Sequence, residues 1–369
     1  METGITKTAP GSKTLLSIQA LRGVAAMFVV AFHATVLWHD HAPGQALVWE
    51  NGNAGVDLFF VISGLVIVLS SSSLAQKADG WRTFVVQRLI RVVPMYWLTT
   101  TGKLIAITLV PALALHSFPT VWNVIASYLF IPAPNANGEI VPVLVVGWTL
   151  SFEMLFYVAF TAALVVRLDP LRVVIPAMVC VAIASLFRTP EWPAVSAVVN
   201  PMVLEFVLGA LIARVYLSFP ARLSPGPLMF VVGLAGAATL IFLPIGTVWD
   251  RAIFWGSGAG AVVVAAVAFE PYVRRHLPVL LVQLGEASYS LYLTHAFVLP
   301  VVGLVVTHLV HRADWLGPIL VGSCLVVSAA ASLVVYQMVE KPMTDWLRHS
   351  VRPPQKSGVL LPAAPRAAR

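Results

Sequence analysis

The sequence predicts an all-α integral membrane protein with about ten transmembrane helices in one bundle and both termini in the cytoplasm. Its 369 residues are 59% hydrophobic and only 11% charged, whereas soluble domains carry about 25% charged residues. The mean hydropathy is +0.87. Ten apolar runs are long enough to cross about 30 Å of hydrocarbon. They cover residues 21–38, 55–74, 94–115, 143–166, 172–188, 196–217, 227–243, 252–269, 288–310 and 316–338.

The distribution of basic residues sets the predicted orientation. With the N-terminus in the cytoplasm, only Arg188, Arg251 and Arg312 of the 23 Lys and Arg residues fall outside, and Lys103 lies within a run. Such a bias toward one side fixes membrane topology. The net charge of +7 is therefore explained without a nucleic-acid partner. The first run is long for a signal peptide, and nine further runs follow it, so we interpret it as a true span.

One domain is expected. Residues 15–345 form the transmembrane domain, and the flanking segments 1–14 and 346–369 are predicted to be disordered cytoplasmic tails. The segment 75–93, which ends before Pro94, alternates arginines with apolar residues and predicts a helix lying along the inner membrane surface. Cys180 and Cys324 fall in apolar runs without disulfide or zinc spacing, so we interpret both as core residues.

Polar residues inside the apolar runs are the candidates for function, because a charge at the bilayer centre costs at least ~2.5 kcal/mol. The first run, LRGVAAMFVVAFH, places Arg22 and His33 on one helix face, about 16 Å apart along the axis. Arg22 is either a topology anchor or part of a site. His33 is either an interhelical hydrogen-bonding group or a general base, for which histidine is suited near neutral pH.

The fourth run carries a carboxylate. In its segment GWTLSFEMLFY, Thr149, Glu153 and Tyr157 share one helix face, and Trp148 lies beside them. A carboxylate at this depth must be paired, hydrogen-bonded or protonated.

The second run begins with NAGVDLFFVISG and carries a second carboxylate, Asp57. This group is either an interfacial helix cap or a group that orients a histidine on the neighbouring helix. Gly64, at the end of the same segment, is expected to let two helices approach closely.

The remaining candidates lie in three places. Glu205 is in the sixth run, and Tyr292 and His295 can share a face in LGEASYSLYLTH; interhelical packing and substrate contact are both open for these residues. Arg88 and Arg91 are three residues apart, so they share a face. Two guanidinium groups there either anchor lipid headgroups or clamp a phosphorylated soluble molecule from the cytoplasm.

A buried base, a buried carboxylate and a cytoplasmic phosphate clamp together describe group transfer from a phosphorylated carrier. The sequence holds no GxxxxGK[ST] loop, no Asp-rich pair for a metal-bound diphosphate and no HExxH motif. An acyl thioester requires none of these, since its chemistry needs a base for the acceptor hydroxyl and donors for the oxyanion. No metal is expected.

The order LRGVAAMFVVAFH, GVDLFFVISG, FVVQRLIRVVPMYW, WTLSFEMLFY, SYSLYLTH and EKP (Glu340 to Pro342) resembles the acyltransferase 3 family of integral membrane acyltransferases over about Leu15 to Pro342. This resemblance implies that acyl-CoA binds from the cytoplasm, with Arg88 and Arg91 on its phosphates. It also implies that His33 acts at the thioester. We expect Glu153 or Asp57 to hold the imidazole and Arg22 to guard the donor channel. Substrate contacts are expected from Trp148, Tyr157, Glu205, Tyr292 and His295.

Within the family, the motifs are most similar to bacterial exopolysaccharide O-acetyltransferases. That similarity implies acetyl-CoA as donor, a glycan or lipid-linked oligosaccharide as acceptor and a multi-pass protein of the bacterial inner membrane. Membrane lipid, a second copy or polysaccharide-assembly proteins are the expected partners. Larger members carry an extracytoplasmic esterase-like domain, which we do not expect here. The bundle is then expected either to complete transfer itself or to hand the acyl group to another protein. The alternatives are acylation of a macrolide or another small hydroxylated metabolite, and transport of lipid-linked sugars.

Overall fold

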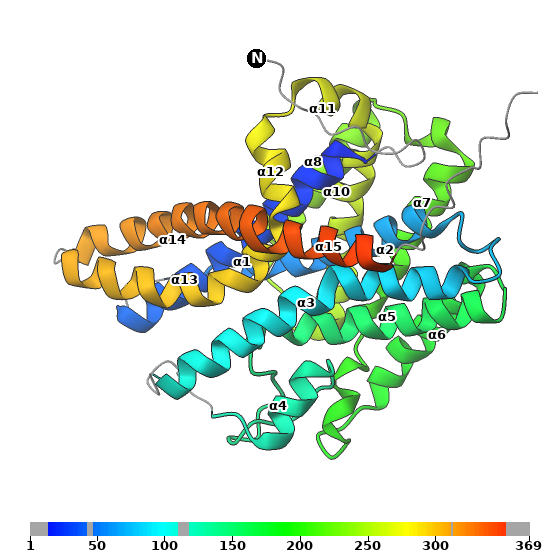
Figure 1. Cartoon of the computed structure of the whole chain (residues 1–369). Helices are drawn as coiled ribbons and strands as arrows, with labels where there is room; N and C mark the ends of the chain where they lie inside the picture. Colours follow the sequence, from blue (N-terminus) through cyan, green and yellow to red (C-terminus); the bar gives the residue numbers. More distant parts are fainter. Residues whose placement is uncertain (1–13, 43–46, 110–117, 311–312, 352–369) are drawn as a thin grey trace, which may run out of the picture.

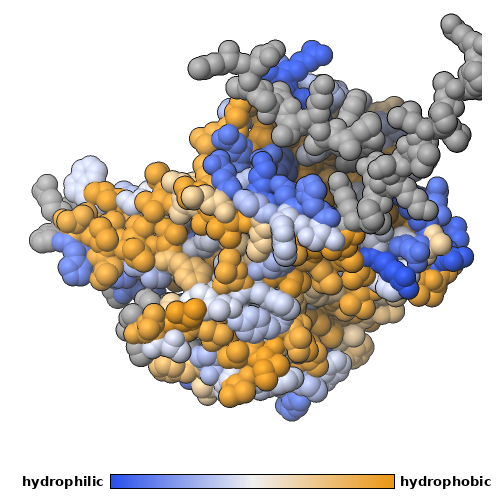
Figure 2. Space-filling view, in the orientation of Figure 1, coloured by the Kyte–Doolittle hydropathy of each residue, from blue (hydrophilic) through white to orange (hydrophobic). Residues whose placement is uncertain are grey.

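The computed structural model describes residues 14–42, 47–109, 118–310 and 313–351. Over these residues the fold is all-helical, with one isolated β-bridge between Pro134 and Ile140. Eight helical stretches in the described chain are long and apolar enough to cross a membrane. Figure 2 shows hydrophobic side chains over most of one face, while hydrophilic ones gather near α15 (Lys341–Val351) and at the right edge. The expected all-α membrane bundle is confirmed at this level.

The long helices are α1 (Leu16–His41), α2 (Ala54–Ser71), α3 (Gly80–Leu109), α5 (Trp148–Val165), α6 (Pro170–Ala184), α7 (Val203–Ser218), α8 (Pro227–Phe242), α10 (Gly256–Ala268), α13 (Ser288–Leu309) and α14 (Ala313–Val335). Short helices connect them: α4 (Val121–Tyr128), α9 (Val248–Asp250), α11 (Glu270–His276) and α12 (Val279–Glu286). Two π-helical segments, Arg251–Trp255 and Tyr336–Glu340, precede α10 and α15.

The predicted count of ten spans is not confirmed, since eight stretches of the described residues are long and apolar enough. Helices α7 and α8 have 16 residues each, or about 24 Å, which is short for a span of about 20 residues. The predicted run 196–217 is divided, because Ala194–Val198 forms a separate 3₁₀-helix before α7 begins at Val203.

Helix α3 also differs from expectation. The predicted surface helix and the span after it are one continuous helix of 30 residues with Pro94 in its interior. Arg88 lies within the bundle and is only 8% exposed, and Arg91 is partly buried, whereas Arg82 is exposed. At the other end of the chain, α15 continues to Val351, so residues 346–351 are helical where a tail was predicted. The other tail residues, 1–13 and 352–369, lie outside the described segments.

Close backbone contact joins α2 to α7 in the core. A Cβ atom on Gly64 would lie 2.0 Å from the Phe206 carbonyl oxygen, and one on Gly209 would lie 1.9 Å from that of Val61. Only glycine permits this approach, which is typical of packed membrane helices. The predicted packing role of Gly64 is confirmed.

The remaining long helices position the candidate site. Helices α13 and α14 pack as a hairpin against α1, and the hairpin tip lies at the left of Figure 1. The first turn of α1 is held by Glu270, whose carboxylate accepts hydrogen bonds from the Leu16 and Ser17 amides at 3.0 and 2.8 Å. We call this side of the bundle the Leu16 end.

Candidate active site

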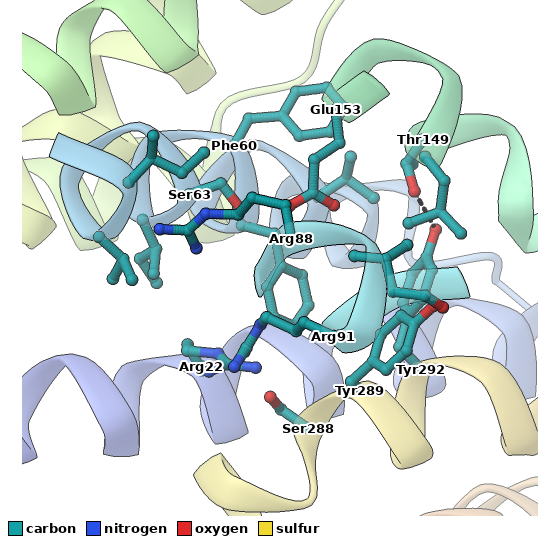
Figure 3. Close-up of a pocket in the computed structure, with 17 residues that line it drawn as sticks. Arg22, Phe60, Ser63, Arg88, Arg91, Thr149, Glu153, Ser288, Tyr289 and Tyr292 are labelled. Atoms are coloured by element: carbon teal, nitrogen blue, oxygen red, sulfur yellow. Dashed lines mark hydrogen bonds between the residues drawn. The ribbon is translucent and has the colours of Figure 1, made fainter. Parts of the chain in front are cut away.

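A cavity opens among α1, α2, α3, α5 and α13, with about 800 Å³ of empty space including its mouth. Three arginines line it: Arg22 from α1, and Arg88 and Arg91 from α3. In Figure 3, Arg22 and Arg91 reach into the same part of this space, with Glu153 on the opposite wall. We call it the arginine cavity. Arg22 is six residues into α1 and Arg88 eight residues into α3, so the cavity lies in the half of the bundle toward the Leu16 end.

Arg88 is fixed by its surroundings while keeping one donor unused. Its Nη2 donates to the Ser70 hydroxyl on α2, and its guanidinium lies 5.4 Å from the centroid of the Phe84 ring. Its buried Nε has no hydrogen-bond partner in the described part of the protein. Buried donors without partners are rare, so this atom marks a place where a ligand acceptor fits.

The three guanidinium groups form no ion pair with any described carboxylate. Glu153 also lines the cavity, and Glu340 lies within electrostatic range of Arg22. The cavity wall therefore carries three cationic groups and one carboxylate. Arginine matches phosphate oxygens geometrically, so the arrangement suits a ligand with several phosphates.

Glu153 takes its partner from its own helix. Oε1 accepts a 2.5 Å hydrogen bond from the Tyr157 hydroxyl one turn later. Tyr157 itself is buried against Phe84 and does not line the arginine cavity. Trp148 also lies outside the lining, edge-on to Phe152 at 5.6 Å. Neither aromatic residue contributes to the surface of the cavity.

Tyr292 of α13 forms a second wall of the cavity, which we call the Tyr292 wall. Its hydroxyl donates to the Val146 carbonyl at 2.5 Å and lies 2.9 Å from the Thr149 hydroxyl. The first turn of α13 is held by Glu340, which accepts hydrogen bonds from the Ser290 amide and hydroxyl at 3.1 and 2.5 Å. The sequence singled out Glu340 only as part of the EKP motif, and its contact with Ser290 was not predicted.

Two histidines lie beyond this wall. The ring of His295 is 6.1 Å from that of Tyr292 and 5.0 Å from that of His33, measured between centroids. The Nδ1 atom of His33 donates to the Val29 carbonyl at 2.9 Å. Neither histidine lines the arginine cavity. We expected Asp57 or Glu153 to hold the His33 imidazole, but in this structure Nδ1 is bonded to a backbone carbonyl. Asp57 is bonded to Arg251 and Glu153 to Tyr157.

Asp57 forms a buried ion pair with Arg251. It is fully buried, and both its oxygens accept hydrogen bonds from Arg251, of which the shortest is 2.8 Å. Arg251 also donates to the Asn53 carbonyl at 3.1 Å. Glu205 of α7 is buried next to this pair, away from the cavity lining. Sequence reasoning missed Arg251, which it placed as an external loop charge.

The structure thus gathers Arg22, Arg88, Arg91, Glu153 and Tyr292 around one cavity. A second group, His33 with His295, adjoins Tyr292, whereas Asp57 and Glu205 belong to a separate buried cluster. No set of three His, Cys, Asp or Glu side chains in the described segments is placed to hold a metal ion. The arrangement provides a cationic site for an anionic donor and imidazole bases behind one wall.

Comparison with known proteins agrees with this chemistry. The family model described as "Acyltransferase domain" matches residues 15–337. The chain is 36% identical over 307 residues to the exopolysaccharide production protein ExoZ of Rhizobium meliloti (strain 1021), covering 79% of this chain and 89% of that protein. It is 28% identical over 325 residues to the acyltransferase MdmB of Streptomyces mycarofaciens, covering 77% and 79%. No solved structure matches the chain significantly. The chain belongs to the acyltransferase 3 family and is an acyltransferase.

Proposed function

We propose that this protein transfers an acetyl group from acetyl-CoA to a hydroxyl of an exopolysaccharide or its lipid-linked precursor in a bacterial inner membrane. The assignment of acetyl-CoA as the donor rests on the arginine cavity. The acceptor assignment is supported by the similarity to a protein named for exopolysaccharide production. Acylation of a macrolide or another small hydroxylated metabolite is the alternative within the same family.

The donor site in this proposal is the arginine cavity. Coenzyme A carries a diphosphate and a separate phosphate, and Arg22, Arg88 and Arg91 offer three forked donors without competing ion pairs. The unpartnered Nε of Arg88 fits a phosphate oxygen. When bound, the donor supplies an activated thioester carbonyl. The apolar lining from α2, which includes Phe59 and Phe60, suits the acyl-bearing arm.

The general base in this proposal is His33. Its Nδ1 is held by the Val29 carbonyl, so in the neutral ring the lone pair is on Nε2. That nitrogen takes the proton of the acceptor hydroxyl, whose oxygen then attacks the thioester carbonyl. A two-step route through acetyl-His33 uses the same atom as nucleophile. Both routes require the acyl end to pass Tyr292, which separates the cavity from the histidines.

The orientation follows from the distribution of charge. Basic residues concentrate on the side predicted to be cytoplasmic, which includes the Leu16 end. The donor then approaches the arginine cavity from the cytoplasm, where coenzyme A esters are found. The protein needs lipid around it, and other polysaccharide-assembly proteins or a second copy are proposed partners.

The experiment uses the purified full chain in lipid nanodiscs with radiolabelled acetyl-CoA and a panel of glycan and macrolide acceptors. We expect label in ester linkage to the glycan, and no transfer by His33→Ala, which should retain the wild-type melting profile. Label on the macrolide alone would replace the proposed acceptor. Failure of the wild type to transfer or hydrolyse acetyl-CoA would overturn the donor assignment, and full activity in His33→Ala would overturn the role of His33.

A further inference from the structure

We infer that His295 is a positioning residue that shares with His33 the proton removed from the acceptor hydroxyl, so that the two imidazoles work as one base. This inference rests on the proposed function, in which His33 takes that proton. It assigns to His295 a part in proton handling in place of the substrate contact expected from the sequence.

The first observation is the tautomer of each ring. Nδ1 of His33 lies 2.9 Å from the Val29 carbonyl oxygen, and Nδ1 of His295 lies 3.1 Å from that of Leu291. A carbonyl oxygen can only accept, so each Nδ1 carries the hydrogen and each neutral ring has its lone pair on Nε2. Each Nε2 can therefore accept a hydrogen bond.

The second observation is the environment of His295. The side chain is 1% exposed, and its buried Nε2 has no hydrogen-bond partner among the described residues. Other histidines, such as His41, His276, His308 and His349, also bond the carbonyl four residues earlier, but these are exposed. His295 differs because its acceptor is sealed from water and left unused.

The third observation is the neighbour. The ring centroids of His295 and His33 are 5.0 Å apart, so the two imidazoles are direct neighbours. The closest titratable group on α13 itself is Tyr292, whose hydroxyl is already bonded to Val146 and Thr149. Once His33 is protonated, its Nε2–H gains an acceptor in Nε2 of His295.

The step balances without another reactant. The O–H bond of the acceptor breaks as the new C–O bond forms, and the C–S bond of the thioester breaks. The proton rests between the two imidazoles and finally passes to the departing thiolate as coenzyme A leaves. His295 adjoins both His33 and Tyr292, and the acyl arm must pass Tyr292 to reach His33. The shared proton is therefore held beside the path of the departing thiolate.

The test compares matched asparagine variants in nanodiscs. His295→Asn retains an amide N–H for the Leu291 carbonyl and removes the Nε2 base. We expect kcat to fall about 10- to 100-fold, a part of the effect of a general base, with both KM values unchanged. The proton inventory in mixtures of H₂O and D₂O should change from curved to linear. His308→Asn is the control, because His308 makes the same kind of bond to the Leu304 carbonyl at 2.8 Å on the same helix but is exposed.

A wild-type kcat and a curved inventory in His295→Asn would overturn the inference. If His295→Asn melts at a lower temperature than the wild type, His295→Gln is used instead, because it keeps a polar group near the position of Nε2. The same changes in kcat and in the proton inventory are expected. If His33→Ala is inactive and the His295 variant is fully active, the role of His295 is refuted and the proposed function stands. A fully active His33→Ala defeats the role of His33 in the proposed function as well.

Discussion

Tyr157 donates a 2.5 Å hydrogen bond to Glu153, one helical turn earlier on α5. Because Glu153 lines the arginine cavity and Tyr157 is buried behind it, the tyrosine fixes the position of the cavity carboxylate opposite the three arginines. We expect Tyr157→Phe to free Glu153 to turn toward the arginines and to raise the KM for acetyl-CoA several-fold. Loss of this hydrogen bond should also lower the free energy of unfolding by about 1 kcal/mol. Steady-state kinetics and thermal unfolding measure the two effects.

Tyr272→Phe provides the control for this variant. Tyr272 is an exposed residue of α11 stacked on His276, and its loss of a hydroxyl should leave KM unchanged. An unchanged KM in Tyr157→Phe would show that Glu153 holds its place without the tyrosine.

Removal of the cavity arginines should weaken donor binding. Each of Arg88→Ala and Arg91→Ala is expected to raise the Kd for coenzyme A by about tenfold or more, because hydrogen bonds to charged groups contribute about 1.5–3 kcal/mol. Isothermal titration of the nanodisc protein measures this change. Arg82→Ala on the same helix is the control, since its side chain is 68% exposed. An equal Kd for coenzyme A in all three variants would show that the donor does not bind in this cavity.

The buried pair of Asp57 and Arg251 should contribute to stability. Asp57→Ala leaves the Arg251 guanidinium without its carboxylate in a buried site, which typically costs about 3–5 kcal/mol. Thermal or denaturant unfolding in detergent should show this loss, and Asp57→Asn combined with Arg251→Gln should recover part of it. Asp345→Ala, which removes a 4.0 Å exposed pair with Arg348, should change stability by less than about 1 kcal/mol. Equal effects of the two alanine variants would contradict the structure.

The contact between α2 and α7 predicts a steric effect. Gly64→Ala places a Cβ atom 2.0 Å from the Phe206 carbonyl oxygen, so the helices must separate and the core must repack, at a cost of about 1–3 kcal/mol. Gly322→Ala is the matched control on α14, where a Cβ atom meets nothing within 4 Å. The melting temperature should fall for Gly64→Ala and hold for Gly322→Ala; equal melting temperatures would contradict the close contact.

The proposed orientation is tested by labelling. After Cys180 and Cys324 are replaced by alanine, single cysteines are introduced at Ala78, in the exposed turn between α2 and α3 at the Leu16 end, and at Ala136, beyond α4. A membrane-impermeant maleimide applied to intact cells should label the cysteine at position 136 and not the one at position 78. The reverse pattern would place the arginine cavity on the outer side.

Most of the bundle could be predicted from the sequence because hydrophobic length is a local property. The exceptions arise where packing overrides local signals. Pro94 suggested a helix boundary, yet α3 continues through it, since a membrane helix surrounded by neighbours can tolerate one missing hydrogen bond. The α7 and α8 runs were apolar enough to count as spans, but the short 3₁₀-helix at Ala194–Val198 has no hydropathy signal.

The candidate site was predictable in its residues and only partly in its contacts. Arg22 and the pair Arg88 and Arg91 stood out because charge is rare in apolar runs, and the structure places all three on one cavity. The partner of Asp57 could not be read from periodicity. Arg251 is 194 residues from Asp57 along the chain, and such pairing depends on how distant helices pack.

The continuity of α3 links the two sides of the membrane mechanically. A helix of 30 residues is about 45 Å long, so a tilt that closes Arg88 on a bound anion also displaces the opposite end of the rod. In the second half of α3, Trp97 donates to the Tyr128 carbonyl at 2.9 Å and Thr101 contacts the Tyr128 hydroxyl at 2.6 Å. Binding of the donor on one side is then expected to displace α4 on the other side through the tilt of α3.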